Sequence, residues 1–205
     1  KLKMNSQSID KTTLGLHLPT DPRWADLAQY SIADILIDHA WCEQKAASAG
    51  ISLIVQYGER EKLVEVLTPI VAEEWAHFRM VLKEMEKRGV KLAQTRGDAY
   101  VIALSKLERK GDKKERQLME KLLINALIEA RSAEKFKILS KNISDESLKD
   151  FYYELMISEA GHYRTFVDLA KEYMSENVVM TRWNELLEAE AKIIEQLGVR
   201  EGAFH

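Results

Sequence analysis

Apolar residues recur along most of the chain at the three- and four-residue spacing of amphipathic helices. Glycines and short polar segments interrupt this pattern where helices are expected to end, as at Gly58, Gly89 and Gly198. The pattern predicts four long helices and one further helix, over about residues 31–57, 59–88, 113–141, 145–174 and 176–197.

Two shorter helices are expected outside the long ones. A capping residue and a proline at 20–22 predict a short helix that carries Trp24. The segment from Gly89 to Gly111 predicts a connection with a helical piece over about 98–109. Pro69 lies inside the second long helix, where we expect a kink.

Two antiparallel helix pairs joined by one long connection have the topology of a ferritin-like bundle. We therefore expect an all-α chain, with a ferritin-like four-helix bundle, one long crossover and additional flanking helices. Its 205 residues fit one domain. Three Pro and nine Gly among abundant Leu, Ala, Glu and Lys favour this helical interpretation.

Composition narrows the cellular setting. A single Cys excludes a disulfide framework and a Cys-rich zinc or rubredoxin-type module in this chain. No run of about 18 apolar residues is present, and the polar start of the chain does not resemble a signal peptide. We therefore expect a cytoplasmic protein without a membrane partner. The net charge of −3 indicates no partner by itself.

An acidic residue interrupts the apolar stripe of two of the predicted helices at matching positions. The stripes run Leu36, Ala40, Glu43 and Ala47 in the first helix, and Leu122, Ala126, Glu129 and Ala133 in the third. Both acids are expected to face the core. A buried carboxylate is costly unless it is protonated, paired with a cation or bound to a metal.

Each of these acids is followed, in the next long helix, by a Glu-x-x-His pair. Glu74 and His77 form the first pair and Glu159 and His162 the second, at 31 and 30 residues from the preceding acid. Residues three apart on a helix project to one side and can bind one ion. A Glu plus a Glu-x-x-His, present twice, is the ligand set of a di-metal carboxylate site in a four-helix bundle.

Carboxylate and imidazole ligands suit Fe, Mn or Zn, and the absence of thiolates argues against a structural zinc site. We expect Glu74 and Glu159 to bridge two metal ions. Glu43 and His77 are then terminal ligands of one ion, and Glu129 and His162 of the other.

Several neighbouring residues compete for roles at this site. His39 lies one turn before Glu43 and Glu73 directly before Glu74, so either can support a ligand from behind, although a packed histidine and a solvated acid are equally consistent with the pattern. Glu134 competes with Glu129, but only Glu129 matches Glu43 in the repeat.

The sequence around these residues resembles the tRNA 2-methylthio-isopentenyladenosine hydroxylase (MiaE) family. The resemblance covers about residues 14–175 and is looser in the crossover. It is carried by the segments 18–24, 36–48, 73–78, 87–90, 126–136 and 158–162.

This resemblance implies a non-haem di-iron monooxygenase that hydroxylates the isopentenyl group of 2-methylthio-isopentenyladenosine in tRNA. Two iron ions would be the cofactor, with O2 as co-substrate and an external electron donor of the reductase or ferredoxin type. The family's ligands correspond to six residues of this chain: Glu43, Glu74, His77, Glu129, Glu159 and His162.

The segment 83–121 adds modest support for a tRNA partner, because its twelve Lys and Arg and seven Asp and Glu give it a net charge of +5. Clustered cations can contact phosphates, although a solvated face of charged helix ends has the same composition. The candidate tRNA-binding residues are Lys83, Lys87, Arg88, Lys106, Arg109 and Lys110.

Two other functions are compatible with parts of the pattern. A ferritin- or rubrerythrin-like protein that handles iron or detoxifies peroxide would use the same ligands, but the absence of a Cys module weakens the rubrerythrin assignment. A purely structural helical bundle leaves the six matched ligands unexplained.

Overall fold

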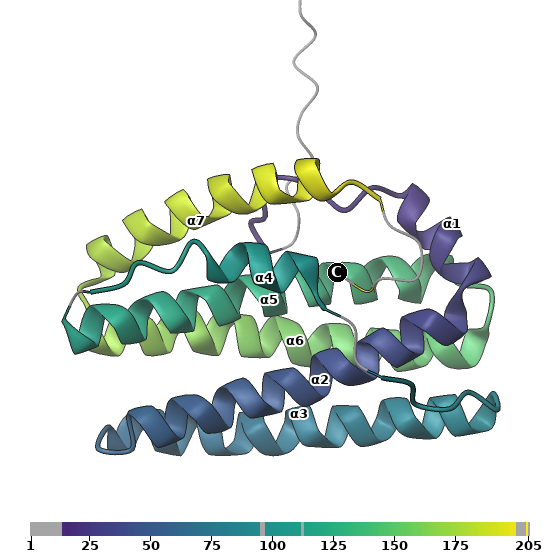
Figure 1. The fold of residues 1–205 in the computed structure, drawn as a ribbon, viewed down its shortest axis with the longest axis horizontal. Coiled ribbons are helices and arrows are strands. Elements are labelled where there is room, and N and C mark those ends of the chain that lie inside the picture. Colours follow the sequence, from purple (N-terminus) through teal and green to yellow (C-terminus); the bar gives the residue numbers. More distant parts are fainter. Residues whose placement is uncertain (1–13, 95–96, 112, 200–203, 205) are drawn as a thin grey trace, which may run out of the picture.

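A computed structural model describes residues 14–94, 97–111, 113–199 and 204 of the chain. Within them the protein is all-helical, as predicted, with seven helices (Figure 1). The helices are α1 (Arg23–Tyr30), α2 (Ile32–Gln56), α3 (Glu61–Lys87), α4 (Ala99–Ser105), α5 (Lys114–Asn142), α6 (Glu146–Tyr173) and α7 (Glu176–Leu197).

The helices α2, α3, α5 and α6 form a four-helix bundle (Figure 1). Short turns join α2 to its antiparallel neighbour α3 and α5 to its antiparallel neighbour α6, and the two pairs meet through α3 and α6. The crossover, residues 88–113, carries α4 back along the bundle to the end where α5 begins (Figure 1). This is the predicted ferritin-like connectivity, with α1, α4 and α7 as flanking helices.

Local signals set several helix boundaries. Asp145 caps α6 by accepting hydrogen bonds from the backbone N–H groups of Ser147 and Leu148. Gly89 follows α3 with a φ of 67°, and the next N–H, of Val90, bonds the carbonyl oxygen of Met85. All five long helices begin and end within two residues of their predicted limits.

The crossover helix is shorter than predicted, because α4 ends at Ser105 rather than near residue 109. The N–H groups of residues 106–108 bond to carbonyl oxygens three residues back, and the backbone then turns to other partners. The carbonyl oxygen of Leu107 accepts a hydrogen bond from Arg182, and the N–H of Arg109 donates to the Glu120 carboxylate. These contacts to α7 and α5 take up backbone groups that a longer helix would use for its own hydrogen bonds.

Pro69 lies inside α3, which continues through it as one helix, and the expected kink stays a prediction. The described helices include none with the length and apolar character needed to cross a membrane.

Candidate metal centre

The bundle brings the six predicted ligands together at its centre. Their ligand atoms form two groups, and within each group the atoms lie within 4.8 Å of one another. Both groups contain Glu74 and Glu159. The first adds Glu43 and His77, and the second adds Glu129 and His162. All six side chains are buried, and each of the four bundle helices contributes.

The two histidines turn their Nδ1 atoms toward the carboxylates. Nδ1 of His77 lies 3.2 Å from Oε1 of Glu159 and 3.6 Å from Oε2 of Glu43. Nδ1 of His162 lies 2.5 Å from Oε1 of Glu74. On the other side of its ring, Nε2 of His162 lies 2.8 Å from Oε2 of Glu73. A carboxylate behind a histidine fixes the tautomer that leaves the inner nitrogen as a ligand.

His39 also contacts a predicted ligand. It is fully buried, and its Nε2 lies 2.6 Å from Oε1 of Glu43. Its ring stacks on Tyr152 and Phe204, with centroids 5.7 Å and 5.1 Å away. Both residues that the sequence placed beside the ligands, His39 and Glu73, therefore touch one of them.

The cluster is rich in negative charge. In the described part of the chain, none of its four carboxylates forms an ion pair with Lys or Arg. Other buried acids of this protein do have such partners: Glu120 bonds Arg182, and Glu190 bonds Arg131. Because uncompensated buried carboxylates are costly, the cluster favours a bound cation.

Without a bound cation, the crowding of buried carboxylates shifts the pKa values of the cluster residues. Burial, together with the charge of Glu159, raises the pKa of Glu74 to about 7. Burial also raises the pKa of Glu43 and Glu129. For His77, burial opposes protonation, but the nearby carboxylates of Glu159 and Glu43 outweigh it and raise the pKa to about 12. Protons thus stay on the cluster without a metal, and metal ions that bind there displace them.

Several buried polar atoms of the cluster are left without an aligned hydrogen bond. They are both carboxylate oxygens of Glu74, Oε1 of Glu159, and the Nδ1 atoms of His77 and His162. Buried polar atoms are almost always satisfied, so such a group indicates a missing partner such as an ion. The oxygen and nitrogen donors fit iron, manganese or zinc, and the buried cluster is compatible with metal binding.

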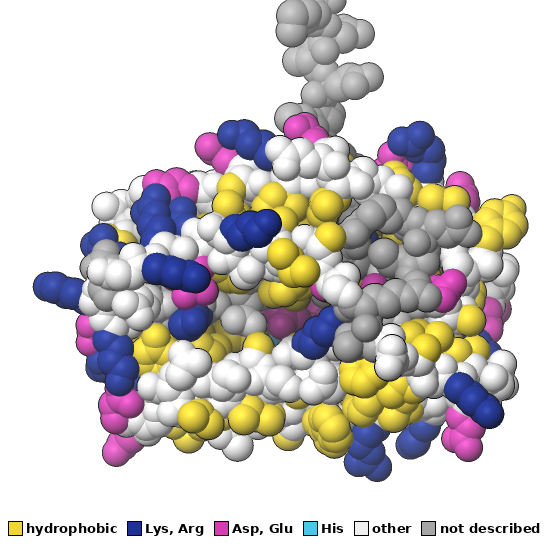
Figure 2. Space-filling view, viewed as in Figure 1, with side chains coloured by type: hydrophobic (Ala, Val, Ile, Leu, Met, Phe, Trp, Pro, Cys, Tyr) yellow, Lys and Arg dark blue, Asp and Glu magenta, His cyan; other side chains and the backbone are white. Residues whose placement is uncertain are grey.

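A small cavity of about 20 Å³ lies against the cluster on the α2–α5 side of the bundle. Figure 2 shows a hollow in the surface between α2 and α4, with acidic side chains at its floor. The residues that line the cavity are Cys42, Glu43, Ala46, Glu74, Ile128, Glu129, Ser132, Glu159 and Phe204.

Phe204 is a lining residue that no feature of the sequence indicates. It lies far from the repeated motif along the chain and in none of the helices, so no periodic pattern indicates its position.

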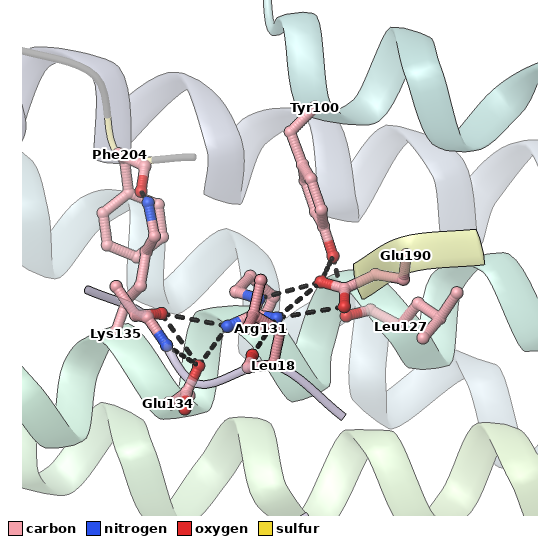
Figure 3. Close-up of polar contacts among 9 residues, drawn as sticks. Leu18, Tyr100, Leu127, Arg131, Glu134, Lys135, Glu190 and Phe204 are labelled. Atoms are coloured by element: carbon pink, nitrogen blue, oxygen red, sulfur yellow. Dashed lines mark hydrogen bonds and ion pairs between the residues drawn. The ribbon is translucent and has the colours of Figure 1, made fainter. Parts of the chain in front are cut away.

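Glu134, the competitor of Glu129, lies outside the cluster and has a different partner. Arg131 is fully buried and pairs with Glu134, while its Nε donates to Glu190 at 2.9 Å (Figure 3). The same guanidinium donates to the carbonyl oxygen of Leu18 at 2.9 Å. This network fastens the N-terminal segment and α7 to α5.

The six candidate tRNA-binding cations fall into two groups at opposite ends of the bundle. Lys83, Lys87 and Arg88 lie near the end of α3, and the other three follow α4 in the crossover (Figure 1). Arg88 is partly buried and pairs with Glu84 and Asp145. Arg109 pairs with Glu185, whereas Lys106 and Lys110 are exposed.

Comparison with known proteins agrees with the resemblance. Residues 7–205 match the family described as tRNA-(MS[2]IO[6]A)-hydroxylase (MiaE). The chain is 36% identical over 190 residues to a tRNA 2-(methylsulfanyl)-N(6)-isopentenyladenosine(37) hydroxylase of Pseudomonas putida, covering 93% of this chain and 91% of that protein. It is 26% identical over 228 residues to the Salmonella typhimurium protein of the same name, covering 87% and 83%.

A solved structure is also similar. It is a protein from Synechococcus described as having aldehyde deformylating oxygenase activity. The two structures align with a TM-score of 0.87 and 32% sequence identity, over 93% of this chain and 94% of the other.

Proposed function

Because this chain belongs to the MiaE family of tRNA hydroxylases, we propose that it hydroxylates the isopentenyl side chain of 2-methylthio-isopentenyladenosine in tRNA. The observation that carries the proposal is the doubled ligand cluster, buried in a chain that matches this family over nearly its whole length. A tRNA substrate also implies a cytoplasmic enzyme.

The proposed cofactor is a pair of iron ions. Glu43 and His77 would hold one and Glu129 and His162 the other, with Glu74 and Glu159 shared between them. The division follows from the two groups of ligand atoms, which have these two carboxylates in common. When bound, the iron pair supplies the activation of O2 that hydroxylation of an unactivated C–H bond requires.

The protein's own residues orient the ligands and keep the site dry. Glu73 accepts a hydrogen bond from the Nε2–H group of His162, so that Nδ1 is the nitrogen that faces the cluster. His39 holds one oxygen of Glu43 from a position packed among aromatic rings. The apolar side chains of Ala46 and Ile128 line a cavity with room for about one water molecule, so little water lies beside the ligands.

The reaction consumes one O2, two electrons and two protons for each hydroxyl group formed. One oxygen atom replaces the hydrogen of a C–H bond as C–OH, and the other leaves as water. The electrons come from an external donor of the reductase or ferredoxin type. The cation groups at 83–88 and 106–110 are the proposed phosphate contacts, and the hollow between α2 and α4 is the proposed entrance (Figure 2).

Isotope labelling tests the proposal in the purified system. Reduced, iron-loaded protein is given ¹⁸O2 and tRNA that carries 2-methylthio-isopentenyladenosine, and the nucleosides are examined by mass spectrometry. We expect one labelled oxygen atom in the isopentenyl group. Unchanged nucleoside under conditions of full iron loading and a working reductant would contradict the proposal.

A second candidate is favoured by the Synechococcus structure, whose described activity removes the formyl group of an aldehyde. The same labelled reaction with an aldehyde in place of tRNA separates the two. Loss of the formyl group from the aldehyde, with the tRNA nucleoside unchanged in its own reaction, would select the second activity.

A further inference from the structure

The ring of Phe204 fills a gap between two helices of the bundle beside the metal cluster. In the described residues, α2 and α5 make no close backbone contact with each other. Phe204 is fully buried between them and packs on His39 of α2 and Phe136 of α5, with centroids 5.1 Å and 5.0 Å away.

The space left at the cluster is too small for the proposed substrate. The cavity of about 20 Å³ is comparable to the space for one water molecule. A cavity that holds benzene is roughly 150 Å³, so the five carbons of an isopentenyl group need on the order of 100 Å³. Part of the wall must therefore move before the side chain approaches the cluster.

Phe204 is the wall residue best suited to move. The other lining residues lie on α2, α3, α5 and α6, where helical hydrogen bonds fix their backbones. Phe204 is outside the helices. Its N–H donates to Oδ2 of Asp38 at 2.6 Å, and its carbonyl oxygen accepts from Nζ of Lys135. These contacts hold the ring in place without making it part of a rigid element.

A larger cavity is lined by two residues that contact Phe204, so movement of these residues would give the displaced ring room. It measures about 470 Å³ and is lined by Trp24 and Lys135, among others. Both residues contact Phe204: its ring meets Trp24 edge-on at 6.2 Å, and Nζ of Lys135 lies 5.8 Å from its centroid.

We propose that the isopentenyl group reaches the metal cluster by displacing the Phe204 ring and occupying its place between α2 and α5. The inference rests on the proposed function and adds a residue that determines specificity. The apolar isopentenyl group replaces the packing contacts that the Phe204 ring loses, whereas an unmodified adenosine has no apolar side chain that could do so. Because the ring stacks on His39, which holds Glu43, its displacement also alters the support of a proposed ligand.

Binding measurements test this role without relying on turnover. Two fluorescent anticodon stem-loops are compared, one with 2-methylthio-isopentenyladenosine and one with adenosine, against iron-loaded wild type and Phe204→Ala. With no ring to displace, the preference for the modified RNA, as a ratio of Kd values, should rise about tenfold, equivalent to about 1.4 kcal/mol. Phe151→Ala is the matched control, since Phe151 also packs near His39, at 6.0 Å, but does not line the cavity.

A second variant covers the case in which Phe204→Ala does not fold. Lys135→Met removes one anchor of Phe204 and keeps the ring, so it should raise the preference in the same direction. An unchanged or lower preference in the folded variants, beside a wild type that prefers modified RNA, would overturn the role of Phe204 and leave the proposed function standing. A wild type that neither prefers nor hydroxylates the modified RNA would overturn both.

Discussion

The buried acids of this protein fall into two chemically different classes. Glu120 and Glu190 lie in the core beside a guanidinium, which neutralises each of them through charge-assisted hydrogen bonds. In the part of the chain that the structure describes, the carboxylates of the cluster pair with imidazoles and not with a guanidinium or ammonium group. A structural role explains the first class, whereas the second requires protons or metal ions.

Removing a shared carboxylate is expected to remove the metal pair. Wild-type protein should bind about two iron ions per chain, and Glu74→Ala and Glu159→Ala should each bind fewer than about one, because both ions lose a ligand. Metal analysis of the purified proteins measures this. Glu120→Gln changes a buried acid outside the cluster and should keep the wild-type iron content. Full occupancy in both alanine variants would disprove the bridging assignment.

Replacing Glu73 tests a residue that orients the proposed ligand His162 and is not itself a ligand. Glu73→Ala removes the hydrogen bond to Nε2 of His162 and should weaken iron affinity by about 10- to 100-fold, while saturating iron still fills the site. Competition with a chelator measures the affinity. The exposed Glu86 on the same helix provides the control Glu86→Ala, and equal affinities of the two variants would argue against a role for Glu73.

At the scale of the helices, local chemistry explains what the sequence predicted and tertiary contacts explain what it did not. Asp145 and Gly89 carry their own capping geometry, so the ends of α6 and α3 were predictable from nearby residues. Beyond the end of α4, the backbone bonds to the side chains of Arg182 and Glu120, and no local pattern reveals that pairing.

The cap of α6 provides a prediction about stability and pH. Asp145→Ala should destabilise the protein by about 1 kcal/mol at neutral pH, since two backbone N–H groups lose their acceptor. Hydrogen bonds from Ser147 and Arg88 lower the pKa of Asp145 from 3.8 to about 2. Its contribution is therefore complete above about pH 4 and is lost as the pH falls toward 2.

Denaturant unfolding of wild type and variant between pH 7 and pH 3 measures this difference. It should stay constant down to about pH 4 and then shrink. A difference that grows as the pH falls would contradict the assigned role of the Asp145 carboxylate.

At the scale of the whole molecule, the repeat was sufficient to predict how four helices meet around one cluster. The matching positions of Glu43 and Glu129, each followed by a Glu-x-x-His pair, fixed which helix faces point inward. The surface was less predictable, because the cations at 83–88 and 106–110 are close in sequence but separated along the bundle (Figure 1). The position of Phe204 was not predicted either, because it depends on tertiary contacts and not on nearby sequence.

The separation of the two cation groups predicts different effects on RNA binding. Lys106→Glu combined with Lys110→Glu should weaken tRNA binding more than Lys83→Glu combined with Lys87→Glu, because α4 borders the hollow (Figure 2). Each lost phosphate contact should reduce the salt dependence of binding by about one unit of slope. Titrations of tRNA binding at several salt concentrations measure the affinity of both double variants, and the iron content of each should be unchanged. The opposite order would place the RNA at the end of α3.

The most direct test of the central claim is made on tRNA from living cells. Nucleoside mass spectrometry is applied to a strain that lacks the gene, complemented with wild type or with Glu74→Ala. We expect 2-methylthio-isopentenyladenosine to accumulate without the gene, wild type to restore its hydroxylated form, and Glu74→Ala not to restore it. Hydroxylated nucleoside at normal levels in the deletion strain, or restored by Glu74→Ala, would contradict a metal-dependent tRNA hydroxylase.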